Sequence, residues 1–160
     1  MTDWDAAYRA GETPWDKGAP SPGLVAELGD RPLLGDVLVP GCGRGNDLRA
    51  IADAGADRVV GLDLSPTAVD EARALLADHP TVAVVCADLF DLPPGMRGTF
   101  DAVFEHTCFC AIPRDRRDDY VRAVADALKP GGILLALFYL TPRDDPDPNL
   151  GPPFNTSHAE

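Results

Sequence analysis

The residues best suited to bind a ligand form a glycine-rich segment in the first third of the chain. Gly41, Gly43 and Gly45 follow a short apolar run, residues 36–40, that indicates a buried strand, and helical spacing of apolar residues begins after them. Glycine lets the backbone turn sharply and approach a ligand closely. The following helix offers unpaired N–H groups and a positive dipole end to a carboxylate or phosphate. This segment therefore predicts a corner that binds a nucleotide-like ligand.

Two aspartates are placed to complete that corner. Asp63 ends the next apolar run and follows Gly41 by about 20 residues, the spacing at which an acid at a strand tip meets ribose hydroxyls. Asp88 ends the third apolar run. Because parallel strands present their carboxyl ends to one crevice, we expect both carboxylates to face it. A helix cap or a turn residue is the alternative for each aspartate taken alone.

The residue after the third glycine separates two classes of ligand. Dinucleotide-binding loops usually carry Gly or Ala where this chain has Asn46. Residues 37–45 (VLVPGCGRG) resemble instead the first motif of class I S-adenosylmethionine-dependent methyltransferases, and residues 128–132 (LKPGG) resemble the turn before that family's fifth strand. The resemblance implies S-adenosylmethionine as cofactor, with ribose and adenine contacts from Asp63 and Asp88. A nicotinamide-dependent oxidoreductase is the alternative enzyme class.

Seven segments carry a closer resemblance. They are Trp4-x-x-x-Tyr8, Gly11-x-Thr13-Pro14-Trp15-Asp16-x-Gly18, Pro20-x-Pro22, Val39-Pro40-Gly41-Cys42-Gly43, Val60-Gly61-Leu62-Asp63-Leu64-Ser65, Thr107-x-Phe109-Cys110-Ala111-Ile112 and Gly151-Pro152-Pro153-Phe154. Together they resemble the thiopurine S-methyltransferase family, on its thiol and halide methyltransferase branch, nearly from end to end. The resemblance implies methyl transfer to a small-molecule thiol or to a soft anion such as a halide or thiocyanate.

The same resemblance implies a set of cofactor contacts and no metal. The contacts come from the N-terminal aromatic residues, the glycine corner and the tips of three strands. They are Trp4, Tyr8, Trp15, Gly41, Cys42, Gly43, Asp63, Leu64, Asp88, Leu89, Glu105 and His106.

The N-terminal aromatic residues have two interpretations. Trp4 and Tyr8 would share one face of a short helix, and Trp15 lies in a loop rich in Pro and Gly. Packing in the core is one interpretation, and a lid that closes over a ligand is the other. We take residues 1–20 as an N-terminal lid.

His106 is the candidate catalytic residue. It follows the fourth apolar run, at the strand tip expected to face the transferred methyl group. An imidazole, with an ordinary pKa near 6.5, suits a general base for a neutral thiol. A position that only flanks the cofactor is the alternative. The branch resembled here is expected to have a tyrosine after the acid, where this chain has Glu105-His106, so no catalytic role is carried over.

Alternating strand and helix patterns predict the fold. Continuous Val and Leu runs indicate strands buried on both faces. We predict one α/β domain, a doubly wound Rossmann-like methyltransferase sheet with parallel central strands and helices on both faces, in which residues 33–140 form the cofactor-binding core. The expected strands are residues 36–40, 58–62, 82–87, 100–104 and 132–140, and the expected longer helices are residues 21–28, 47–54, 65–78 and 113–128.

Residues 141–160 contain five prolines and few apolar residues, and we predict a loop there. Members of the resembled family continue with another helix and two strands, so we expect the C-terminal strands to be missing and one sheet edge to be uncovered. A truncated cofactor-binding module without turnover is the corresponding alternative.

The composition of the chain restricts the classes of partner that it can bind. The chain has a formal net charge of −12, with 14 basic residues scattered among 26 acidic ones, which disfavours nucleic acid. No apolar run suggests export or membrane insertion. Four cysteines without a C-x-x-C pair indicate reduced, mostly buried thiols. We expect a cytoplasmic protein with a small-molecule acceptor, monomeric or, alternatively, dimeric through the uncovered sheet edge.

Overall fold

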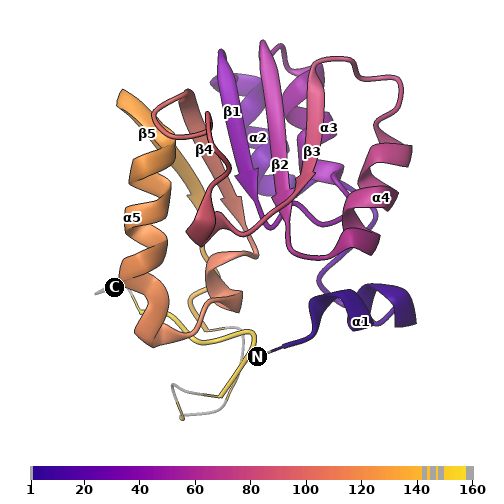
Figure 1. Ribbon diagram of the computed structural model, residues 1–160, viewed down its shortest axis with the longest axis vertical. Coiled ribbons are helices and arrows are strands. Elements are labelled where there is room, and N and C mark those ends of the chain that lie inside the picture. The colour runs from indigo at the N-terminus through magenta and orange to yellow at the C-terminus, as the bar shows by residue number, and fades with distance from the viewer. Residues whose placement is uncertain (1, 142–143, 145–146, 148–149, 158–160) are drawn as a thin grey trace.

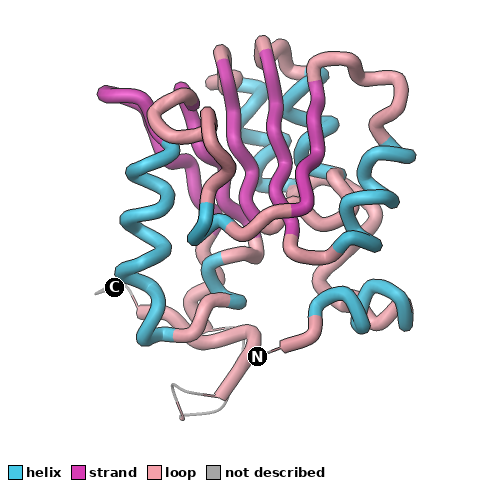
Figure 2. Tube along the Cα trace, viewed as in Figure 1, coloured by secondary structure: helices cyan, strands magenta, loops and turns pink. Residues whose placement is uncertain are grey.

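A five-stranded parallel sheet forms the centre of the molecule (Figures 1 and 2). The computed structural model describes residues 2–141, 144, 147 and 150–157. The strand order β3-β2-β1-β4-β5 confirms the predicted doubly wound sheet. The strands are β1 (Asp36–Pro40), β2 (Arg58–Asp63), β3 (Val82–Cys86), β4 (Phe100–His106) and β5 (Leu128–Leu137).

Helices cover both faces of this sheet. One apolar cluster contains residues of α2, α3 and α4, and a second contains residues of α5 and η1. In Figure 1, α2 and α3 lie behind the sheet and α5 lies in front of it. The helices are α1 (Trp4–Ala10), α2 (Pro22–Asp30), α3 (Asn46–Asp53), α4 (Pro66–Leu75) and α5 (Arg117–Ala127), and the short 3-10 helices are η1 (Leu89–Asp91), η2 (Phe109–Ala111) and η3 (Arg114–Arg116).

The sequence of β1 is a continuous apolar run because both faces of the strand are covered. Val37 and Val39 belong to the apolar cluster on one face, and Leu38 belongs to the cluster on the other. Successive side chains of a strand point to opposite faces. A strand covered on both sides therefore needs apolar residues at every position.

Some element boundaries differ from those predicted. β4 runs to His106 rather than to residue 104, because its last two residues pair with β5. β5 spans Leu128–Leu137 rather than residues 132–140, and an irregularity in the pairing between Phe100 and Ala102 accommodates the Pro-Gly-Gly turn. α4 ends at Leu75 rather than at residue 78.

The chain after β5 forms a loop, as predicted, in the part that the structure describes. Residues 142–143, 145–146, 148–149 and 158–160 of the predicted loop lie outside the described residues. The Phe154 N–H donates to the Cys110 carbonyl at 2.7 Å, and so attaches this loop to η2. Ile133 and Leu134 of β5 are exposed at the end of the described sheet. Each described helix is too short or too polar to cross a membrane.

Candidate functional site

The glycine corner lies between β1 and α3. Gly41, Gly43 and Gly45 all have positive φ angles, of 61°, 53° and 83°, a backbone conformation that other residues adopt at a cost. A Cβ on Gly43 would lie 2.7 Å from the Tyr8 hydroxyl, and a Cβ on Gly41 would lie 3.0 Å from Cβ of Cys108. Glycine is therefore required here because other parts of the same chain pack against the loop.

Asp63 joins the tip of β2 to this corner. Its Oδ2 accepts a hydrogen bond from the Gly43 N–H at 2.8 Å, and its Oδ1 accepts one from the Ser65 N–H at 2.9 Å. The side chain is buried, with 8% of the residue exposed, and burial raises the pKa of the carboxyl above its ordinary value. A carboxylate has about four acceptor positions. Acceptor capacity therefore remains for a hydroxyl group of a ligand.

The tips of β2 and β3 lie side by side. Asp63 pairs in register with Cys86, and Leu64 is an exposed apolar side chain between the two strands' following loops. Asp88 accepts a hydrogen bond from the Phe90 N–H at 2.9 Å through Oδ1 and so caps η1. The prediction of mostly buried thiols is wrong for Cys86, which is exposed. Cys86 lies at the end of β3, the edge strand opposite β5 in the described sheet.

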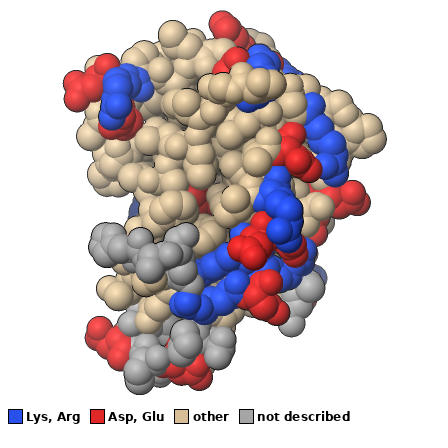
Figure 3. Space-filling model, turned by 90° about the vertical axis from the view of Figure 1, so that its left-hand side faces the viewer, with Lys and Arg blue, Asp and Glu red and all other residues tan. Residues whose placement is uncertain are grey.

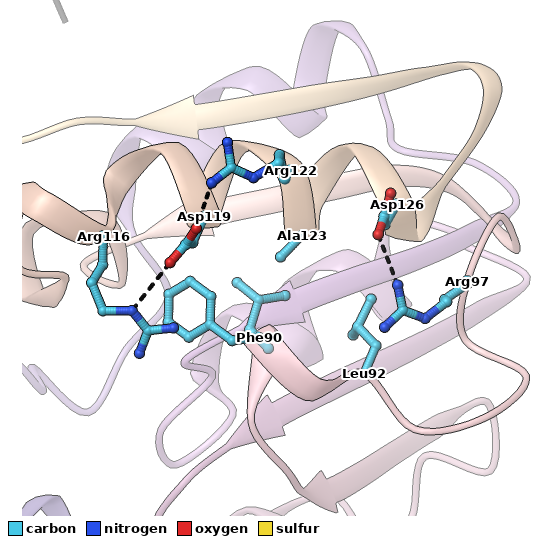
Figure 4. Close-up of a pocket in the computed structure, with 9 residues that line it drawn as sticks. Phe90, Leu92, Arg97, Arg116, Asp119, Arg122, Ala123 and Asp126 are labelled. Atoms are coloured by element: carbon cyan, nitrogen blue, oxygen red, sulfur yellow. Dashed lines mark hydrogen bonds and ion pairs between the residues drawn. The ribbon is translucent and has the colours of Figure 1, made fainter.

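A groove of about 360 Å³ lies outside this corner, between η1 and α5. Figure 4 shows Arg116 over the Phe90 ring, 4.0 Å from its centroid, and the Arg97–Asp126 ion pair at 2.7 Å. Leu89, one of the predicted cofactor contacts, is buried and lines this groove. On the side of the molecule that carries α5 and β5, basic and acidic side chains lie next to one another rather than in separate patches (Figure 3). The described residues on this face therefore form no cluster of positive charge that could bind an anion.

The N-terminal aromatic residues form one cluster above the glycine corner. Tyr8 is buried and its hydroxyl accepts a hydrogen bond from Trp15 Nε1 at 3.2 Å. Trp4 and Trp15 contact edge to face, with 5.5 Å between ring centroids. Burial raises the pKa of Tyr8 to about 12. The structure thus brings three predicted contact residues together beside Gly43.

Polar contacts that the sequence analysis missed hold this cluster in place. Arg44, within the glycine corner, donates to Thr13 Oγ1 at 2.8 Å and to Asp16 Oδ2 at 2.7 Å. Asp5 of α1 accepts hydrogen bonds from Ser65 Oγ at 2.8 Å and from the backbone N–H of residue 67 at 3.0 Å. Figure 1 shows α1 beside α4, at the carboxyl ends of the strands. Asp16 lies within a motif already recognised, but nothing in the sequence links it to Arg44.

Glu105 and His106 lie on opposite faces of the sheet because they are consecutive residues of β4. Glu105 is 1% exposed and accepts hydrogen bonds from the Phe109 N–H at 3.0 Å and from the Tyr120 hydroxyl at 2.9 Å. Burial raises the pKa of the Glu105 carboxyl. We assign its side chain to holding η2 against α5 rather than to a cofactor contact.

His106 faces α3. Its Nδ1 lies 2.9 Å from Asp47 Oδ2, and its Nε2 lies 3.4 Å from the Tyr139 hydroxyl. Thr107, the next residue, has a φ of 64°, which is unusual for a residue other than glycine. Such backbone strain clusters at functional sites. Asp47 was absent from the predicted site, because its partner lies on an element far away in the sequence.

The cysteines near the corner are partly buried thiols. Cys42 packs against Gly61 of β2, where a Cβ on that glycine would lie 2.7 Å from the Cys42 sulfur. Burial raises the pKa of the Cys42 and Cys108 thiols. A thiol with a raised pKa stays protonated at neutral pH and reacts slowly.

Known proteins resemble this chain in sequence and in fold. A family model described as "Thiopurine S-methyltransferase (TPMT)" matches residues 1–160. The chain is 37% identical over 163 residues to "Probable thiol methyltransferase 2" of Arabidopsis thaliana, covering 98% of this chain and 68% of that protein. It is 37% identical over 160 residues to "Thiocyanate methyltransferase 1" of Brassica oleracea, covering 96% of this chain and 67% of that protein. The chain therefore spans about two thirds of the length of these relatives.

A solved structure described as the "DhpI-SAM-HEP complex" has the same fold. It superposes with a TM-score of 0.68 at 29% identity, over 90% of this chain and 67% of that one. Its name includes the methyl donor SAM.

Proposed function

Because the chain belongs to the thiopurine S-methyltransferase family, we propose that it transfers the methyl group of S-adenosylmethionine to a small thiol or soft anion. The thiol and thiocyanate methyltransferases among its relatives support this acceptor class. The observation that carries the proposal is the 2.8 Å hydrogen bond between Gly43 and Asp63, since it unites the glycine corner and the acid at the tip of β2 in one binding surface. A nicotinamide-dependent oxidoreductase does not fit this family.

The residues around the corner fit the cofactor. The remaining acceptor capacity of the Asp63 carboxylate suits ribose hydroxyls, and the exposed Leu64 beside it suits the apolar adenine. We place Asp88 and Leu89 on the adenine side. The backbone of residues 41–43 would face the donor, in the left-handed conformation that glycine adopts without strain. Trp4, Tyr8 and Trp15 would cover the bound ligand as a lid.

S-adenosylmethionine, when bound, supplies a methyl group on a sulfonium that is already a good leaving group. The chain therefore needs no nucleophile of its own, in agreement with the raised thiol pKa values of Cys42 and Cys108. What it supplies is alignment of the acceptor and exclusion of water. Alignment alone accounts for about 7–11 kcal/mol of such a barrier.

Isothermal titration and a turnover assay test the proposal. The purified chain should bind S-adenosylmethionine and S-adenosylhomocysteine but not NAD. Incubation with S-adenosylmethionine and thiophenol, thiocyanate or iodide should give the corresponding methyl compounds by gas chromatography. Binding of NAD, or binding of the methyl donor without turnover of any acceptor, would overturn the proposed activity; the second result would indicate a cofactor-binding module.

We also propose that the protein is cytoplasmic and monomeric. The four free cysteines support a reducing compartment. The alternative assembly is a dimer through the exposed β5. Light scattering on the purified chain should give the mass of one copy, and fractionation of source cells should place it with cytoplasmic markers.

A further inference from the structure

Asp47 and His106 form a pair at the rim of the proposed site. Asp47 lies in the first turn of α3 and His106 is the last residue of β4, and the structure places Oδ2 and Nδ1 2.9 Å apart. Both side chains are largely buried, with 16% and 18% exposed. A pair held this way by two separate elements has one defined geometry.

The second oxygen of Asp47 fixes the orientation of its carboxylate. Asp47 Oδ1 accepts a hydrogen bond from the backbone N–H of Ser21 at 2.7 Å. An ionised carboxylate only accepts hydrogen bonds, so the Nδ1 of His106 must be the donor. The neutral imidazole then carries its proton on Nδ1, and Nε2 is left as an acceptor.

The unprotonated nitrogen points away from Asp47, toward Tyr139. The two rings stack with centroids 6.0 Å apart, and the 3.4 Å distance from Nε2 to the Tyr139 hydroxyl is long for an O–H···N hydrogen bond. Tyr139 is exposed and lies in the loop after β5. The S–H group of an incoming methyl acceptor can therefore replace the Tyr139 hydroxyl at Nε2.

We propose that Asp47 is a positioning residue that holds His106 as the base for neutral thiol acceptors, an inference that rests on the proposed function. The thiol proton moves to His106 Nε2 as the sulfur electron pair forms a bond to the methyl carbon. The bond from that carbon to the sulfonium breaks, its electrons stay on the sulfonium sulfur, and the imidazolium later releases the proton to water. Iodide and thiocyanate carry no proton, so they do not need the pair.

The titratable groups around the imidazole come from three elements. Asp47 faces it from α3, Glu105 precedes it on β4, and Tyr139 stacks on it from the loop after β5. Glu105 points to the other face of the sheet. Among the residues that the structure describes, the Asp47 carboxylate is thus the charged group that contacts the ring.

Nitrogen-15 NMR of the imidazoles tests the geometry without any methyl transfer. At a pH where the ring is neutral, His106 should show a protonated Nδ1 and a bare Nε2, with its signals assigned by their loss in His106→Gln. Asp47→Asn keeps an oxygen for Ser21 but turns an NH₂ group toward Nδ1, so the proton should move to Nε2. A wild-type ring protonated on Nε2, or a tautomer unchanged by Asp47→Asn, overturns the proposal.

Turnover with two kinds of acceptor tests the role. With an alkyl thiol such as ethanethiol, at a pH of about 7.5 that lies above the ordinary imidazole pKa and below the thiol pKa, Asp47→Asn should lower kcat by at least 10-fold. His106→Gln should lower it by about 100-fold, as expected for a lost general base. Both should change kcat for iodide by less than 2-fold. The double variant should be no slower than His106→Gln. Asp53→Asn, an exposed position on the same helix, is the matched control and should behave as wild type.

The turnover assay separates a failure of the Asp47–His106 pair from a failure of the proposed function. Equal losses with ethanethiol and iodide, or no loss with either, overturn the role of the pair. Absence of turnover with every acceptor in the wild-type chain overturns the proposed function instead, and the NMR result then decides whether Asp47 sets the tautomer of His106.

Discussion

The hydroxyl of Tyr8 occupies the space that a side chain at Gly43 would need. The two groups come from α1 and from the glycine corner, and a Cβ at position 43 would lie 2.7 Å from the Tyr8 oxygen. The corner and the N-terminal segment are therefore one packing unit. A change in the loop should therefore displace the N-terminal segment even before any ligand binds.

Gly43→Ala should displace the N-terminal segment and abolish tight binding of S-adenosylhomocysteine. Its cost has two parts, the left-handed backbone and the contact with Tyr8. Gly98→Ala is the control for the first part, because Gly98 also has a positive φ, of 63°, and nothing lies within 4 Å of its Cβ position. The control should lose about 1–2 kcal/mol of stability and keep its affinity in isothermal titration. Equal affinities for the two variants would contradict this account.

Asp63→Ala should weaken S-adenosylhomocysteine binding by about 1.5–3 kcal/mol, the range for hydrogen bonds to a charged group. The structure adds a loss of stability, because the Gly43 and Ser65 N–H groups lose their acceptor. Each buried donor left unpaired costs about 1–3 kcal/mol. Titration and urea unfolding measure the two effects, with Asp53→Ala as an exposed control. Unchanged affinity would remove Asp63 from the ribose site.

Arg44→Gln should loosen the lid, because it removes the contacts to Thr13 and Asp16. Trp4 and Trp15 are the chain's two tryptophans, so their fluorescence reports on this segment directly. Acrylamide should quench the variant more strongly than wild type, and S-adenosylhomocysteine should reduce quenching in the wild type. Arg49→Gln, in an exposed ion pair on α3, is the control. If quenching is the same with and without ligand, the aromatic cluster is part of the core and not a lid.

Glu105→Gln should stabilise the protein at neutral pH. Burial raises the Glu105 pKa above its ordinary value of 4.5, so the folded state holds the proton more tightly than the unfolded state. Stability from this group is complete below pH 4.5 and falls as the pH rises through the folded-state pKa. Urea unfolding of wild type and variant at several pH values should show a difference that grows with pH. A wild type that loses stability toward acid relative to the variant would contradict this sign.

The parts of the candidate site that the sequence could place depend on local patterns. The glycine corner and the strand-tip aspartates follow from apolar periodicity and spacing along one stretch of chain. The Asp47–His106 and Arg44–Asp16 pairs could not be predicted, because each depends on how distant elements meet in the folded chain. Glu105 was misplaced for a simpler reason: the strand was ended at residue 104, so the alternation that separates positions 105 and 106 was not applied.

Cys86 is suited to selective chemical labelling because it is exposed. It is the exposed thiol of the chain, whereas Cys110 is buried with a pKa raised to about 11 and Cys42 is protected by β2. A maleimide dye should therefore label position 86 selectively in the folded protein. Because Cys86 lies in register beside Asp63, such a dye would sit next to the proposed adenosine position. The same location exposes the protein to inactivation by oxidants and thiol-reactive compounds.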